Sequence, residues 1–226
     1  MVTVKYYPTI NFETTEGDYF GKDLIDMDLK PYSIDTSYQS GMCPAQKEYW
    51  KNTWTMHCPF AIMFDYWEKQ QKITPHNMSE QAWEALYVED GRHLNGPHPE
   101  VQLKINYMFW TDSPDVWIEQ KQTNELAAHG IELVQGSFCI SAWQRPINLG
   151  VRLTRGGKFD LMKGMPVSHI KLIDRKNNSN IELVRADHIP EKILRKWDQD
   201  ARYTRFNTHK TWSAIMKRVK NGFRVS

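Results

Sequence analysis

Hydrophobic and polar positions alternate with a period of two through most of the chain, a pattern typical of half-buried β-strands. Val2 to Thr9 forms the first such run, and similar runs recur at short intervals between residues 101 and 184. The strands predicted there are Val101 to Trp110, Asp115 to Gln122, Ile131 to Ser141, Ile147 to Thr154, Lys158 to Met162, Val167 to Asp174 and Asn180 to Val184. We therefore expect a mainly β body, an antiparallel sandwich or a barrel of jelly-roll-like form.

The connections between these runs carry turn residues, which favours hairpins. They are Ser113-Pro114, Gly156-Gly157, Lys163-Gly164 and Asn177 to Asn180. Earlier in the chain, Thr53 to Ile73 holds two runs of β-forming residues and predicts a strand pair, with Pro59 at an edge or bulge. Pro44 to Asn52 predicts one short helix that begins with proline. Residues 74–100 are expected to form a long surface loop, because glycine, proline and histidine gather near its end.

The period changes to that of a helix near the end of the chain. Pro190 opens a run whose apolar stripe contains Ile193, Leu194, Trp197 and Ala201, and a second stripe contains Trp212, Ile215, Met216 and Val219. Two amphipathic helices are predicted here. We expect a β-rich body at residues 1–188 and a helical tail at 189–226 that packs on the body or on a partner.

Charge is distributed unevenly along a chain whose net charge is only +2. Ala201 to Ser226 contains no Asp or Glu and is rich in Lys and Arg, whereas Asn11 to Asp35 is acidic. This separation favours docking of the tail on an acidic protein surface, of the same chain, of another copy or of a partner. The residues expected to make these contacts are Arg202, Arg205, Lys210, Trp212, Lys217, Arg218 and Lys220.

Nucleic acid is an alternative partner for the same tail. Lys and Arg neutralise phosphates, and aromatic side chains stack on bases. The aromatic residues interleaved with the cations are Tyr203, Phe206, Trp212 and Phe223, although some of them fall on the apolar stripe. A charge run is more often a solvated face, so protein docking is the favoured interpretation.

Cysteine content and hydropathy indicate an intracellular protein. Cys43, Cys58 and Cys139 are an odd number without the spacing of a disulfide framework or a zinc site. Neither a signal peptide nor an apolar run long enough to span a membrane is present. We expect no secretion and no membrane contact.

One group of residues suggests metal chemistry. His98 and Glu100, separated by a proline, together with His169 form a candidate site for iron, and Arg175 is a candidate clamp for 2-oxoglutarate. This pattern is the alternative prediction of an iron and 2-oxoglutarate hydroxylase. Prolines on both sides of His98 favour a loop, and His169 shares a strand face with Lys171, which predicts a solvated side chain. No metal or cofactor is therefore expected in the favoured interpretation.

The segment Trp143-Gln144-Arg145-Pro146 is a candidate anchor. An Arg beside a Trp forms a cation–π contact that serves equally in a structural corner or in ligand binding. We favour the structural corner for Trp143 and Arg145. Sequences typical of nucleophilic hydrolases or of phosphate-binding glycine loops are absent.

Two stretches resemble an uncharacterised family of proteins encoded by tailed bacteriophages and some bacteria. They are MCPAQKEYWKNTWTMHCPFAIMF at Met42 to Phe64 and SAWQRPINLGVRLTRGGKFDLMKGMPVSHIKL at Ser141 to Leu172. The resemblance covers residues 40 to 175 and brings no catalytic residues with it. It implies a phage protein acting in the host cytoplasm or the virion. With the charge separation, this predicts a phage-encoded, non-enzymatic binding or virion-associated protein.

Overall fold

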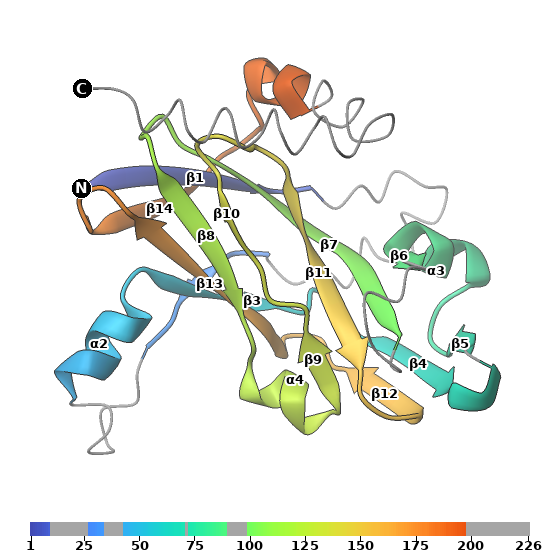
Figure 1. The fold of residues 1–226 in the computed structure, drawn as a ribbon. Helices are drawn as coiled ribbons and strands as arrows, with labels where there is room; N and C mark the ends of the chain where they lie inside the picture. Colours follow the sequence, from blue (N-terminus) through green and yellow to red (C-terminus); the bar gives the residue numbers. More distant parts are fainter. Residues whose placement is uncertain (10–26, 34–42, 71, 90–98, 198–226) are drawn as a thin grey trace.

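The fold is described by a computed structural model over residues 1–9, 27–33, 43–70, 72–89 and 99–197. Three β-sheets contribute to one main hydrophobic core (Figure 1). The predicted mainly β body is confirmed. Among the described residues, no helix is both long enough and apolar enough to cross a membrane.

The largest sheet has six strands. Its order is β14 (Ile181–Arg185), β1 (Val2–Pro8), β7 (Glu100–Trp110), β11 (Pro146–Leu153) and β9 (Ile131–Leu133), with β6 (Tyr87–Glu89) also paired to β7. The pair β1 and β14 is parallel. The expectation of an antiparallel body is therefore wrong at this edge, where two strands from opposite ends of the chain meet after a long crossover.

The other two sheets are smaller. A five-stranded sheet runs β10 (Ser137–Cys139), β8 (Val116–Lys121), β13 (Pro166–Asp174), β3 (Thr53–His57) and β2 (Lys30–Pro31). A three-stranded sheet runs β12 (Gly157–Leu161), β4 (Ile62–Trp67) and β5 (Lys72–Pro75). The short helices are α2 (Pro44–Trp50), η2 (Glu68–Gln70), α3 (Glu80–Leu86), α4 (Asn124–Ala128) and one at residues 191–197.

The predicted hairpins are wrong, although the predicted strands are present. Each of the four turn sequences joins strands that belong to different sheets: β7 to β8, β11 to β12, β12 to β13 and β13 to β14. The predicted pair within Thr53 to Ile73 fails in the same way, because β3 and β4 lie in separate sheets. The predicted strand Ile131 to Ser141 is split into β9 and β10, again in two sheets. A turn residue sets the direction of the backbone but not the identity of the next hydrogen-bonding partner.

Alternating burial explains why these segments are strands. In β11, Leu149, Val151 and Leu153 are completely buried, and the residues between them are partly exposed. Side chains of a strand point to opposite faces in turn, so these three enter the core together. Burying each stabilises the fold by about 1.5–3 kcal/mol relative to full exposure.

The predicted long loop at residues 74–100 is wrong in its first half, which contains α3 and β6. The hydroxyl of Ser79 accepts a hydrogen bond from the backbone N–H of Ala82, 3.1 Å away. Ala82, Trp83 and Leu86 are buried on one side of this helix. Ser79 is a typical N-cap residue, and this apolar spacing signals a short helix. Residues 90–98 lie outside the described part of the chain.

The start of the predicted C-terminal helical region is confirmed by the helix at residues 191–197. Its Ile193 packs against Met108 and Trp110, which attaches the helix to β7. Leu194 and Trp197, from the same predicted stripe, remain 38% and 37% exposed. The second predicted helix lies outside the described residues.

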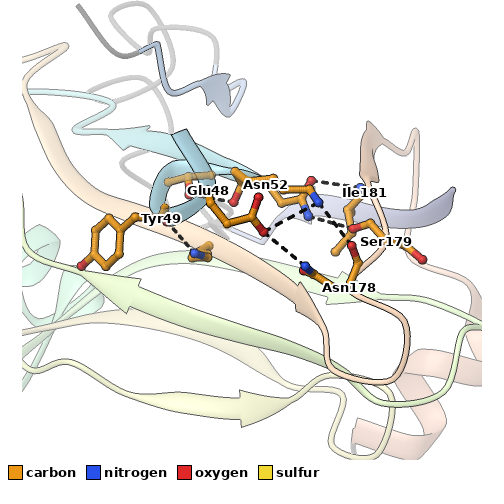
Figure 2. A network of polar contacts seen from close by, with 9 residues as sticks. Glu48, Tyr49, Asn52, Asn178, Ser179 and Ile181 are labelled. Carbon is orange, nitrogen blue, oxygen red and sulfur yellow. Dashed lines mark hydrogen bonds and ion pairs between the residues drawn. The ribbon is translucent and has the colours of Figure 1, made fainter. Parts of the chain in front are cut away.

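A network of polar contacts fastens α2 to the turn between β13 and β14 (Figure 2). Asn52 takes the left-handed conformation at φ 54°. Its side-chain amide donates to the carbonyl of Ser179 at 3.0 Å, and its side-chain oxygen accepts from the N–H of Ile181 at 3.0 Å. Asn178 also donates to Glu48 of α2 at 3.2 Å. Because α2 buries none of its residues, these contacts provide much of its attachment.

Asn52→Ala is expected to lower the free energy of unfolding by about 3 kcal/mol. About 2 kcal/mol comes from the two lost hydrogen bonds and about 1 kcal/mol from placing alanine in the left-handed region. Asn52→Gly loses the same bonds without that conformational strain, so it should be less destabilising by up to about 1 kcal/mol. Urea denaturation measures both effects. Asn177→Ala, in the same turn, is the control; equal losses in the Gly and Ala variants would contradict the conformational part.

Candidate binding pocket on the five-stranded sheet

Four side chains form a row across the five-stranded sheet. Lys30 pairs with Thr55, Thr55 with His169, and His169 with Lys121, so β2, β3, β13 and β8 each contribute one residue. Directly opposed residues in antiparallel strands share a face of the sheet. The other face of the same strands carries Met56, Ile170 and Ile118, which are buried in the main core. The row therefore lies on the face that is turned away from the core.

This row lines a cavity of about 610 Å³. In Figure 1, α2 and α4 lie in the lower half of the view, beside the strands of this sheet. Both helices contribute to the lining, as do the strands. Its lining includes Lys30, Tyr32, Tyr49, Trp50, Thr55, His57, Lys121, Gln122, Glu125, Gln135 and His169. A cavity of this size is within the range of pockets for small molecules.

Aromatic rings cover His169. The Tyr32 and Trp50 rings are stacked, with centroids 4.4 Å apart. Each ring meets the imidazole nearly edge-on, at centroid distances of 4.7 Å for Tyr32 and 5.3 Å for Trp50. The Oγ1 of Thr55 lies 3.1 Å from Nδ1 of His169, within hydrogen-bond distance. The imidazole is therefore held in place from the strand and from both rings.

Two lysines support the helix end that carries Trp50. The Lys121 ammonium lies 3.6 Å from the centre of the Tyr49 ring, a cation–π contact. Lys171 donates to the backbone carbonyl of Tyr49. Burial and the nearby positive charge of Lys121 both lower the pKa of Lys171. The C-terminal end of α2 is thereby connected to β8 and β13 at the edge of the cavity.

Burial and nearby positive charges lower the pKa of both histidines of the cavity. Burial lowers the pKa of His57, and the positive charge of Lys30 lowers it further. Burial also lowers the pKa of His169, where His57 and Lys121 act in the same direction. Glu125 raises the pKa of both. Nδ1 of His57 is buried and has no hydrogen-bond partner among the described residues.

The lysines at the two ends of the row are not neutralised by acidic side chains, although Lys121 contacts the Tyr49 ring. Among the described residues, neither Lys30 nor Lys121 forms an ion pair with a carboxylate. Lysine offers three donors and no acceptor. The arrangement thus provides positive charge at both ends, and neutral imidazoles and a hydroxyl between them. It suits an anion with several oxygen atoms.

His169 is buried, and the prediction that it is solvated is wrong. Its side of β13 is covered by Tyr32 and Trp50, residues distant in sequence that the strand pattern does not reveal. Glu100, its predicted metal partner, lies in another sheet and accepts a hydrogen bond from Arg152. Arg175, the predicted clamp, stacks 3.6 Å from the centre of the Trp117 ring and does not line the cavity.

His98 lies outside the described residues, so the three-residue iron site stays a prediction. Within the part of the chain that is described, no group of three or more His, Cys, Asp or Glu side chains could hold a metal ion. The seven predicted tail contacts also lie outside it: Arg202, Arg205, Lys210, Trp212, Lys217, Arg218 and Lys220.

The predicted cation–π contact of the Trp143 segment is present. The Arg145 guanidinium lies 4.6 Å from the centre of the Trp143 ring, and that ring meets Phe138 edge-on at 5.6 Å. Burial lowers the pKa of Arg145. Neither residue lines the histidine cavity.

Sequence reasoning did not identify most of the pocket. Lys30, Thr55, His57 and Lys121 lie far apart in the sequence and only the register between their strands unites them. Glu125 could have been placed on a helix, because Thr123 caps α4 through a 3.2 Å bond from the N–H of Leu126, and Gly130 follows in a left-handed conformation. Such a cap pair marks a short helix.

Comparisons with known proteins give weak similarity to solved structures alone. No protein-family model matches the chain, and no curated protein matches it. Among solved structures, it is similar to the native dUTPase of EIAV with 10% sequence identity and a TM-score of 0.38. The match covers 83% of this chain and 97% of that chain. At this TM-score the similarity establishes neither a shared fold nor a shared activity.

The free energy of unfolding is expected to fall between pH 7 and pH 5.5. The pKa values of His57 and His169 in the folded protein lie below their ordinary value of 6.5, so the unfolded chain binds more protons in this range. The loss begins as pH falls through 6.5 and ends below the folded-state pKa values. Urea denaturation at several pH values measures it. His57→Gln and His169→Asn should each flatten the slope, whereas Gln135→Ala, a non-titrating lining residue, should not; unchanged slopes in both histidine variants would contradict the assignment.

Proposed function

We propose that this chain is a binding protein that holds a small anionic ligand in the histidine cavity. The observation that carries the proposal is the row from Lys30 to Lys121, whose two cations flank Thr55 and His169 without carboxylate partners among the described residues. An anion placed over the row would meet two ammonium groups and the hydroxyl of Thr55. Charge-assisted hydrogen bonds of this kind are about twice as strong as neutral ones.

The surroundings of the row support ligand binding more than a structural role. On the six-stranded sheet Arg152 pairs with Glu100, whereas the two lysines of the row pair with no acid among the described residues. Thr55 and His169, which lie between the lysines, are buried, so an anion placed over them is screened less than one in bulk water. Tyr32 and Trp50 offer apolar contact to an organic part of the ligand.

A panel of inorganic phosphate, sulfate and citrate tests this function by thermal unfolding of the full chain, with sodium chloride at matched ionic strength as the reference. At least one of the three anions should stabilise the protein, by about 2.7 kcal/mol when its concentration is a hundred times Kd. Lys30→Met and Lys121→Met should each remove most of the stabilisation, because each deletes one end of the row.

Lys5→Met is the matched control, since Lys5 is exposed on β1 in another sheet. It should retain the full stabilisation. Equal stabilisation of the wild type and both row variants by every anion would indicate a general salt effect, and the proposal would be wrong.

We also retain contact with another protein through the C-terminal tail as a second proposed function. The described start of this tail supports it: Ile193 attaches the helix to β7, while Leu194 and Trp197 keep exposed apolar surface. The phage setting and the jelly-roll-like form of the body likewise stand as proposals, resting on the resemblance and on the alternation of strands between sheets. A scaffold with its own core can present such a tail to a second copy or to a partner.

Truncation after Asp200 is expected to change the association of the chain. Light scattering coupled to size exclusion should show concentration-dependent self-association in the full chain and a monomer in the truncated form. Association that weakens as salt rises would indicate a contact through charges. Identical masses for both forms at all concentrations would contradict docking between copies.

A further inference from the structure

The two lysines of the row are separated by the full width of four adjacent strands. Lys30 on β2 opposes Thr55 on β3, which opposes His169 on β13. His169 in turn opposes Lys121 on β8. Neighbouring strands lie about 4.8 Å apart, so the Cα atoms of the two lysines are separated by about 14 Å. The lysines therefore stand at opposite ends of any ligand that lies along the row.

The Lys121 ammonium is held beside the C-terminal end of α2. It lies 3.6 Å from the centre of the Tyr49 ring and 5.4 Å from the centre of the Trp50 ring. Lysine has three donors, so Lys121 can still donate to an anion on the side turned away from the Tyr49 ring. Lys30 is exposed on β2, the edge strand at the other end of the row. The register and the cation–π contact thus separate the two positive charges.

The groups between the lysines suit an uncharged part of a ligand better than a charged one. Thr55 and His169 are buried, and Oγ1 of Thr55 lies within hydrogen-bond distance of Nδ1 of His169. The stacked rings of Tyr32 and Trp50 lie against the imidazole. A charged group placed there would lose hydration away from both ammonium groups, whereas a hydrocarbon chain would gain contact with the rings. The row therefore matches a ligand with charged ends and an apolar middle.

We propose that the cavity binds a linear dicarboxylate, with one carboxylate at Lys30, the other at Lys121 and the carbon chain along the aromatic rings between them. The inference rests on the proposed function, since it specifies the anion that the cavity takes. Two carboxylates balance the two ammonium groups in charge, and each forms charge-assisted hydrogen bonds with its lysine. A cavity of about 610 Å³ has room for such a molecule.

Calorimetric titration of the full chain at pH 7 and constant ionic strength tests the bridging, with adipate, malonate and hexanoate as the probes. Adipate has the length to approach both lysines, whereas malonate reaches only one at a time. Hexanoate has the length of adipate but a single carboxylate. Adipate should bind at least about tenfold more tightly than either, as expected for one additional hydrogen bond between charged groups. Equal affinities for adipate and malonate, or for adipate and hexanoate, overturn the inference.

Lys30→Met and Lys121→Met distinguish bridging from general damage to the cavity. Each should weaken the binding of adipate at least about tenfold, because one carboxylate loses its cation. Hexanoate needs only one lysine, so its affinity should change by less than about threefold in each variant. Lys5→Met, on β1 in another sheet, is the matched control and should keep the wild-type preference for adipate. Equal losses of adipate and hexanoate binding in both row variants overturn the inference.

Phosphate and sulfate separate this inference from the proposed function. A protein that binds either of these compact anions at least as tightly as adipate overturns the preference for two separated charges, while the anion-binding function stands. A protein that binds neither the dicarboxylates nor any other anion of the panel overturns both.

Discussion

The pairing of β13 with β3 on one side and with β8 on the other is the constraint on which the pocket depends. It places Thr55, His169 and Lys121 side by side on one face of the sheet. The opposite face of the same strands carries the residues of the core, including Met56 and Ile170. A register slip by one residue would exchange the two faces of the sheet. The register of these strands therefore determines both the packing of the core and the geometry of the pocket. The stability of the core thereby protects the arrangement of the polar row.

The helix that covers the row depends on this same framework through polar contacts. No residue of α2 is buried, and its C-terminal end is held by Asn52, by Lys171 and by the stacking of Trp50 on Tyr32. Contacts of this kind are individually weak compared with burial of an apolar side chain. Elements with little buried apolar surface open more readily than the core. The cover of the pocket is therefore the part best able to admit a ligand without unfolding the sheets.

Different charged residues act on the pKa values of His57 and His169 in the cavity. Lys30 and Lys121 each act on one histidine, whereas Glu125 acts on both. Partial burial makes the cationic form of either imidazole costly, and the lysines add to that cost. Under the proposed function, a bound anion would raise the pKa of both imidazoles, because it would place negative charge beside them. The lysines that lower these pKa values beyond the effect of burial are the groups proposed to attract an anion.

The sequence by itself determined where most strands lie, because alternating burial is a local property that each segment carries in its own residues. β7, β8, β11, β12, β13 and β14 all fall close to their predicted positions, and so does α2 with its proline at the first turn. The short helices α3 and α4 were missed, although Ser79 and Thr123 mark their beginnings. Tertiary structure alone decided which strands pair, since hydrogen bonds between backbones are alike for all sequences and the partner depends on the whole core. The sequence therefore predicts His169 as a strand residue. Its burial by Tyr32 and Trp50 depends on the tertiary structure, which brings these distant segments together, and so does its place between Thr55 and Lys121.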